Sequence, residues 1–214
     1  NTSGILVFAD DIIISPKIIA SYSKDKVWFV GERRVEHSNV SDPKHVLKCD
    51  WSWNCNKTDH WWWWGTLANN VKLAYQGLVK HAKTNKAIDK CMERLLGYTR
   101  SVSNILYGFS DVYYVPKRFY KSYAQVASIF LATESFVETA VLGILFCLDD
   151  VKNHVSFGNN SILIWYVKTR NQPWVHFKPS TFFQHPVKWS RLKRFSKEHV
   201  NFYCDIVVPW VHGR

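Results

Sequence analysis

The sequence lacks several features that would assign it to a class of protein at once. Its five cysteines include no Cys-x-x-Cys pair, which argues against a zinc site. No apolar run approaches the roughly 20 residues of a membrane-spanning helix, and the nearest, Phe136–Leu148, is shorter and contains Glu138. We find no signal peptide, internal repeat or low-complexity segment. What remains is a chain of 214 residues, 47% hydrophobic and 21% charged, which suits one globular domain with a sizeable core.

Long blocks of lysine and arginine are also missing, although the formal net charge is +11. Such a balance favours anionic partners. Because the charge is spread along the chain, we expect a phosphate-bearing ligand rather than duplex nucleic acid. Aromatic residues are plentiful, with 11 Trp, 10 Tyr and 13 Phe. Since sugars and bases both stack on indole rings, this content indicates binding surfaces in addition to a core.

Four Asn-x-Ser/Thr sequons begin at Asn1, Asn39, Asn56 and Asn159. One or two would mean little, but four in polar surroundings favour the secretory pathway. We therefore expect glycosylation at Asn39, Asn56 and Asn159, and no nucleic-acid partner. In an oxidising compartment Cys49 and Cys55 could form a disulfide, although their spacing alone does not establish it.

An apolar run from Gly4 leads into Asp10 and Asp11 and continues through three isoleucines to Ser15. A β-branched run of this length predicts a buried strand covered on both faces. Adjacent carboxylates at its end repel one another and resist desolvation. A divalent cation would relieve that cost, and oxygen ligands suit Mg²⁺ or Mn²⁺, which in turn bind a diphosphate. The alternative is that the two aspartates cap a turn.

Tryptophan is concentrated in one short segment, with six tryptophans between residues 51 and 64. This number exceeds what a core needs, and two explanations stay open. In one, Trp61, Trp62 and Trp63 form an aromatic wall that faces a sugar or a peptide. In the other, the cluster fastens a long loop to the domain.

The spacing of apolar residues predicts helices over Leu67–Leu96, Lys117–Leu131 and Thr133–Leu148. We expect a break in the first helix at Thr84-Asn85, a C-terminal cap at Gly97 and an N-cap at Thr133. The lysines of this first helix are expected to lie on its solvent-exposed face. Short runs of β-branched and aromatic residues predict further strands: Val27–Val30, Ser110–Pro116, Ser161–Val167, Trp174–Lys178 and Val200–Val208.

Glu138 lies within the apolar face of the third predicted helix, between Phe136 and Ala140. A buried carboxylate is costly, or its pKa rises so that it stays neutral. A general base, or an acceptor for a substrate hydroxyl, would account for it. The alternative is an acidic residue stabilised by the helix dipole, a role that Glu134 fits better.

Three further residues are candidates for substrate or metal binding. Asp111 opens a predicted strand where it enters from a loop, and we expect it to contact substrate. His185 precedes Pro186, which holds it in an extended conformation. His185 and Lys188 could therefore bind a metal and its diphosphate together, whereas the alternative for His185 is an ordinary surface position.

The order of these features is what a GT-A nucleotide-sugar glycosyltransferase requires. Carboxylates hold a divalent metal that neutralises the diphosphate leaving group, aromatic residues stack the acceptor, and a buried carboxylate accepts the proton of the acceptor hydroxyl. We therefore expect an α/β fold in which a GT-A-like mixed sheet is flanked by helices. The alternative is a non-catalytic carbohydrate-binding or scaffold domain that uses the tryptophan-rich loop.

The chain also carries five short blocks: Gly4–Ile12, Trp61–Trp64, Ser110–Pro116, Phe136–Val141 and His185–Lys188. These blocks resemble the conserved blocks of the STELLO-type glycosyltransferase-like domain family. The resemblance implies a membrane-anchored Golgi protein whose lumenal GT-A-like domain takes a nucleotide-sugar donor and a glycan or glycoprotein acceptor. By this resemblance, Asp10 and Asp11 match the Asp-Asp of the metal motif and Glu138 matches the acidic residue of another block.

The chain departs from that family pattern in two respects. Ser15 stands where an Asn-like residue is expected, and the strands that would bind the nucleotide base would precede Asn1. We therefore expect residues 1–214 to be a single glycosyltransferase-like domain, the C-terminal portion of a GT-A-type catalytic domain cut from a longer chain, with the membrane anchor upstream. A protein that lacked those strands altogether would be a non-catalytic relic.

Overall fold

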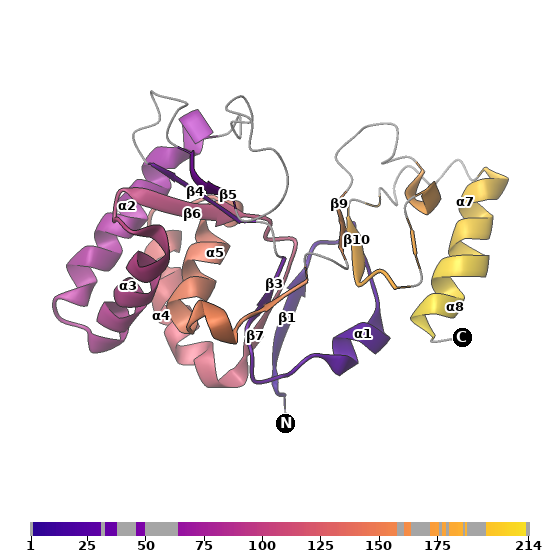
Figure 1. The fold of residues 1–214 in the computed structure, drawn as a ribbon, viewed down its shortest axis with the longest axis horizontal. Coiled ribbons are helices and arrows are strands. Elements are labelled where there is room, and N and C mark those ends of the chain that lie inside the picture. Colours follow the sequence, from indigo (N-terminus) through magenta and orange to yellow (C-terminus); the bar gives the residue numbers. More distant parts are fainter. Residues whose placement is uncertain are drawn as a thin grey trace. The chain divides into compact units, whose positions relative to one another are not determined.

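The computed structural model describes residues 2–30, 33–37, 46–49, 64–157, 161–163, 172–175, 177–178, 180–185, 187 and 196–212 (Figure 1). The chain divides into two compact units. Unit 1 comprises Asn1–Leu6 and Lys24–Ser156, and unit 2 comprises Val7–Ser23 and Phe157–Arg214. The described residues form an α/β fold in which mixed sheets are flanked by helices, as the sequence predicts at that level of detail.

The longer helices of unit 1 are α2 (Trp64–Ala82), α3 (Lys86–Thr99), α4 (Tyr120–Leu131) and α5 (Val137–Leu148). The break at Thr84-Asn85 is confirmed, because the Asn85 side chain accepts hydrogen bonds from the Ala87 and Ile88 N–H groups and caps α3. The predicted cap at Gly97 is wrong. Helix α3 continues to Thr99, and Arg100 closes it in the left-handed conformation, with φ of 67°.

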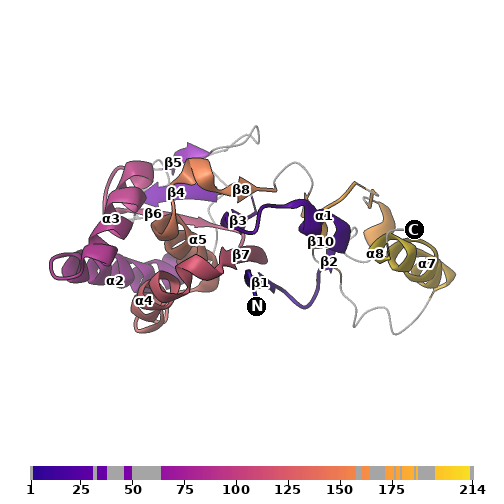
Figure 2. The ribbon, with the colours of Figure 1, turned by 90° about the horizontal axis from the view of Figure 1, so that it is seen from below.

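Helix α5 is the centre of unit 1, and every residue from Thr139 to Leu148 is buried. Its sequence is apolar on all sides, as is typical of a helix enclosed by other elements. In both views it lies between helices α2 and α3 on one side and strands β3 (Trp28–Phe29) and β7 (Val112–Pro116) on the other (Figures 1 and 2). The rings of Phe29 and Phe146 meet edge to face, with 5.5 Å between their centroids.

The start of α5 differs from the sequence prediction. The helix begins at Val137 instead of following a cap at Thr133, because the residues after α4 form a turn in which Glu134 has a φ of 52°. Asn70 of α2 holds this turn by donating to the Glu134 carbonyl oxygen and accepting from the Ser135 hydroxyl. Glu138 therefore lies in the first turn of α5, where a carboxylate is favoured by the helix dipole, and not in the helix interior.

Unit 1 contributes to a mixed sheet with strand order β1-β7-β3-β8, in which β1 (Gly4–Phe8) and β8 (Val155–Ser156) are the edges. Strand β3 pairs antiparallel with β7 and parallel with β8. A second sheet, with order β5-β4-β6, is antiparallel and consists of β4 (Arg33–His37), β5 (Val46–Cys49) and β6 (Asn104–Gly108). Helix α5 packs against β6.

The run that begins at Gly4 is not the doubly covered strand that its composition predicts. Strand β1 ends at Phe8, a turn follows at Asp10 and Asp11, and the isoleucines continue into a separate strand. Ile5 and Phe8 are 51% and 52% exposed. The reason is that β1 is an edge strand, whereas its neighbour β7 is buried along its whole length.

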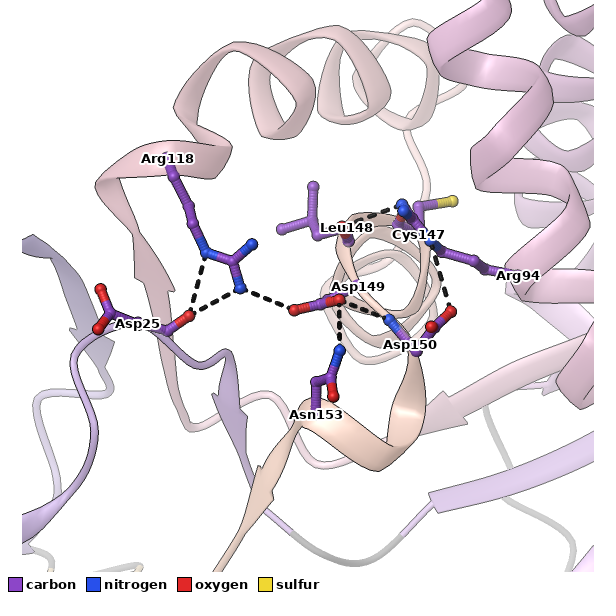
Figure 3. A network of polar contacts seen from close by, with 8 residues as sticks. All are labelled: Asp25, Arg94, Arg118, Cys147, Leu148, Asp149, Asp150 and Asn153. Atoms are coloured by element: carbon purple, nitrogen blue, oxygen red, sulfur yellow. Dashed lines mark hydrogen bonds and ion pairs between the residues drawn. The ribbon is translucent and has the colours of Figure 1, made fainter.

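A polar network holds the C-terminal end of α5 (Figure 3). Arg94 of α3 donates to the carbonyl oxygens of Cys147 and Leu148, at 2.8 and 3.0 Å. These oxygens belong to the last turn of the helix and have no partner within it. Arg94 also lies 3.8 Å from the Asp150 carboxylate. One arginine therefore serves as the cap of α5.

Arg118 forms the other half of this network (Figure 3). It donates to Asp149 Oδ2 at 2.8 Å and to the carbonyl oxygen of Asp25. Burial alone would raise the pKa of Asp149, but hydrogen bonds from Asn153, from the next backbone N–H and from Arg118 lower it overall. The carboxylate is therefore ionised and fully engaged.

A disulfide between Cys91 and Cys147 joins α3 to α5. Both cysteines are buried, at 1% and 2% exposure. The sequence gives no sign of this pairing, because 56 residues separate the two positions. The Cys49–Cys55 bridge that the sequence suggests lies outside the described side chains, and Cys204 is exposed and free.

Unit 2 contains a mixed sheet with order β2-β10-β9, formed by β2 (Ile13–Ile14), β10 (Phe183–His185) and β9 (Ser161–Leu163). Strand β10 pairs antiparallel with β2 and parallel with β9. Ser15 follows β2, donates its N–H to the Phe182 carbonyl oxygen and caps helix α1 (Pro16–Ser21). The N-terminal part of unit 2 is thereby attached to its C-terminal part.

The last predicted strand, Val200–Val208, is wrong. The segment is helical and consists of α7 (Lys197–Asn201), the π-helix η7 (Phe202–Val207) and α8 (Val208–Val211). Phe202 and Val207 both pack against Ile13 and Val187. A π-helical turn places residues five apart on the same face, which explains why this core requires it.

Two further findings complete the fold. The strand predicted at Trp174–Lys178 is wrong as well, because Pro173–Val175 forms a 3₁₀ helix, η5. In the described part of the chain, no helix combines the length and the hydrophobicity needed to cross a membrane.

Candidate functional site

In unit 2 the structure brings together Asp11 and His185, two residues that the sequence singles out as metal ligands. Asp11 lies in the turn between β1 and β2, and His185 ends β10. Because β2 and β10 pair antiparallel, with Ile13 opposite Gln184, the residues beyond the pairing approach one another. The Val187 N–H donates to the Asp11 carbonyl oxygen at 2.7 Å. Asp11 Oδ1 and His185 Nε2 lie 3.0 Å apart.

The pair is well shielded from solvent, since the Asp11 and His185 side chains are 18% and 8% exposed. This separation is that of a hydrogen bond from His185 Nε2–H to the Asp11 carboxylate, which orients the ring; a metal ion held by the same two atoms would take the place of that proton. Asp10 lies in the same turn but is exposed, and the structure does not place it in the pair. The neighbouring Gln184 is fully buried and donates its amide to the Pro173 carbonyl oxygen; nothing in the sequence marks that contact.

The separation of the two side chains suits a divalent cation. Two adjacent ligands of an octahedral ion, each at about 2.1 Å, lie roughly 3.0 Å from one another. A mixed carboxylate and imidazole set favours Mn²⁺ over Mg²⁺, because imidazole is the softer ligand. Within the described residues no third His, Cys, Asp or Glu joins the pair. Such ions are often bound by one or two protein ligands together with substrate phosphates, so the residues present fit the group.

In unit 1 the structure relates Glu138 to Asp111. Asp111 lies in the connection between β6 and β7 and is partly buried. Burial raises the pKa of Glu138 to about 7; its own backbone N–H opposes the rise, and the charge of Asp111 adds to it. Glu138 Oε2 is buried and has no hydrogen-bond partner among the described residues. A carboxyl with these properties can take up or release a proton near neutral pH.

Several predicted site residues lie outside the residues whose side chains the structure describes: Trp61, Trp62, Trp63, Lys188, Asn39, Asn56 and Asn159. The roles assigned to them stay predictions. The candidate residues that are described fall into two groups, Asp11 with His185 in unit 2 and Glu138 with Asp111 in unit 1.

Comparison of the chain with protein-family models, with curated proteins and with solved structures finds no match. Any assignment of function therefore depends on the chemistry of these side chains.

Proposed function

We propose that the protein is a divalent-metal-dependent glycosyltransferase domain of GT-A type, which transfers a sugar from a nucleotide-sugar donor to a hydroxyl of a glycan or glycoprotein. The observation that carries the proposal is the approach of Asp11 and His185 to 3.0 Å in a shielded part of unit 2. The resemblance of five blocks to STELLO-type domains supports it.

Asp11 and His185 are the residues that would hold the metal, preferably Mn²⁺. When bound, such an ion neutralises the charge that develops on a diphosphate leaving group. Asp10 and Lys188 are the further groups that the sequence offers for the metal and the phosphates. The β2–β10 pairing holds the turn and the strand end in register, so neither ligand needs to be ordered on binding.

Glu138 is the residue of unit 1 that best fits a general base for the acceptor hydroxyl. Its pKa of about 7 matches the pH at which a base is most effective, and Oε2 has no hydrogen bond to give up among the described residues. Asp111 tunes this pKa through its charge and is the substrate contact proposed from the sequence.

Metal binding is tested without an assay of transfer. We expect Mn²⁺ with UDP or GDP to raise the melting temperature of the protein, since a ligand that binds the folded state stabilises it. Asp11→Asn and His185→Ala should abolish the rise, whereas Asp89→Asn, an exposed aspartate of α3, should keep it. An unchanged melting temperature for the intact protein, with every nucleotide diphosphate tried, would contradict the proposal.

A second function, carbohydrate binding without catalysis, is favoured by the tryptophans between residues 51 and 64. It predicts glycan binding that persists in EDTA and in Asp11→Asn but is lost when Trp62 and Trp63 become Ala. The two functions are distinguished by incubating the protein with a nucleotide sugar. Release of nucleotide diphosphate that requires both Mn²⁺ and Glu138 would support the glycosyltransferase over the non-catalytic binding domain.

A further inference from the structure

Four lysines lie around the turn from α2 to α3, and we call this surface the basic end: Lys80, Lys83, Lys86 and Lys90. All four are exposed, and none forms an ion pair with a described residue. Backbone hydrogen bonds from Thr84 and Asn85 to the His81 carbonyl oxygen hold the turn between the two helices.

Two of these lysines, Lys86 and Lys90, lie where they oppose helix stability. Lys86 is the first residue of α3, and the helix dipole disfavours a cation at an N-terminus. Lys86 and Lys90, four residues apart on α3, also repel one another. An anionic partner bound at this end would reverse both effects.

The carboxylates near this end do not neutralise it. Asp149 is engaged by Arg118, and Asp150 lies beside Arg94, so these acids already have cations of their own. Asp89 of α3 is the acidic residue that remains within the turn region, and Glu93 follows one turn later. The lysines therefore keep an excess of positive charge that is available to a partner.

The buried Cys91–Cys147 disulfide limits what that partner can be. Disulfides of this kind persist in oxidising compartments, which are separated from nucleic acid and from the anionic cytoplasmic leaflet of membranes. In oxidising compartments the abundant polyanions are sulfated glycans. We propose that the basic end of unit 1 binds a sulfated glycan chain.

The test uses the full chain and a size-defined heparin dodecasaccharide as the probe, in EDTA. Lys83→Gln, Lys86→Gln and Lys90→Gln together should weaken binding by at least about tenfold and lower the slope of log K against log salt by about two to three. The matched control removes the same charge from exposed lysines of unit 2, by Lys17→Gln, Lys178→Gln and Lys197→Gln. Its affinity should change less than about twofold.

Equal losses in the two triple variants would show that only net charge matters and would overturn the proposal. So would the absence of heparin binding, or binding of RNA as tight as that of heparin, which would indicate a nucleic-acid partner. An unsulfated oligosaccharide of the same length should fail to compete. The measurement is independent of the proposed transferase activity, because Asp11→Asn should bind heparin as the unaltered protein does.

Discussion

At the scale of single residues, Glu138 shows how the structure changes the meaning of a sequence pattern. Its helix begins later than the apolar spacing predicts, so Glu138 is a first-turn residue that the helix dipole favours. Burial and Asp111 act in the opposite direction and raise its pKa to about 7. The position of Glu138 in the first turn therefore explains why a carboxylate is tolerated there, while its raised pKa sets it apart from an ordinary glutamate.

This balance predicts how stability depends on pH. Because the folded protein keeps the Glu138 proton to higher pH than the unfolded chain, its free energy of unfolding falls as the pH rises from about 5 to 8. Glu138→Gln removes that loss, and we expect it to be more stable than the unaltered protein at pH 8 by about 1–2 kcal/mol, the effect being screened because the group is partly exposed.

Urea unfolding at pH 5 and pH 8 measures the difference, and Glu93→Gln, at an exposed position of α3, is the control. A stability difference that is the same at both pH values would show that the Glu138 carboxyl titrates normally.

Residue type alone was enough to select Asp11 and His185, but not to pair them. An aspartate after an apolar run and a histidine before a proline are visible in the sequence, whereas the β2–β10 register that joins them depends on contacts between distant segments. The coupling of Asp111 to Glu138 escaped prediction for the same reason.

At the scale of elements, the helices of unit 1 depend on how their ends are held. Arg94 caps α5 with a single guanidinium nitrogen shared between two carbonyl oxygens. Arg94→Met should lower the free energy of unfolding by about 1–2 kcal/mol, since it leaves both oxygens without this donor. Lys86→Met makes a similar change at an exposed position of the same helix and should cost little. Chemical denaturation compares the two, and equal losses would argue against the cap.

The elements themselves were predictable where periodicity is strong. The apolar spacing locates α2, α3, α4 and α5, and the break at Asn85, because a side-chain cap leaves a sequence signal. Val200–Val208 was misassigned as a strand, since β-branched residues dominate it and the five-residue spacing of Phe202 and Val207 fits neither regular period.

At the scale of the whole molecule, the Cys91–Cys147 bridge closes a loop of 56 residues within unit 1. Replacing both cysteines by alanine should lower the free energy of unfolding by about 2–4 kcal/mol, in line with the loop entropy released in the unfolded chain. Unfolding of the variant is compared with that of the intact protein with and without reductant. If reductant shifts the variant as much as the intact protein, the stabilising bond lies elsewhere.

The α/β class of the fold follows from the sequence, whereas the division of the chain into two compact units does not. Alternating helical and strand patterns give the α/β class. The two compact units are discontinuous in the chain, since the two segments of unit 2 flank the Lys24–Ser156 segment of unit 1 in the sequence. Such a division depends on contacts between segments that are far apart in the chain, which explains why no local sequence pattern marks the boundary.

The β2–β10 pairing has a consequence for synthesis. The Asp11–His185 pair can form only after His185 has been synthesised, which is about 170 residues after Asp11. At the usual speed of translation that interval lasts roughly 10–35 s. During this time unit 1 can emerge and fold, whereas the first segment of unit 2 has no partner strand. The nascent chain therefore carries the isoleucines of β2 without their partner strand until β10 has been synthesised, and a chaperone that protects short apolar segments would find this stretch available.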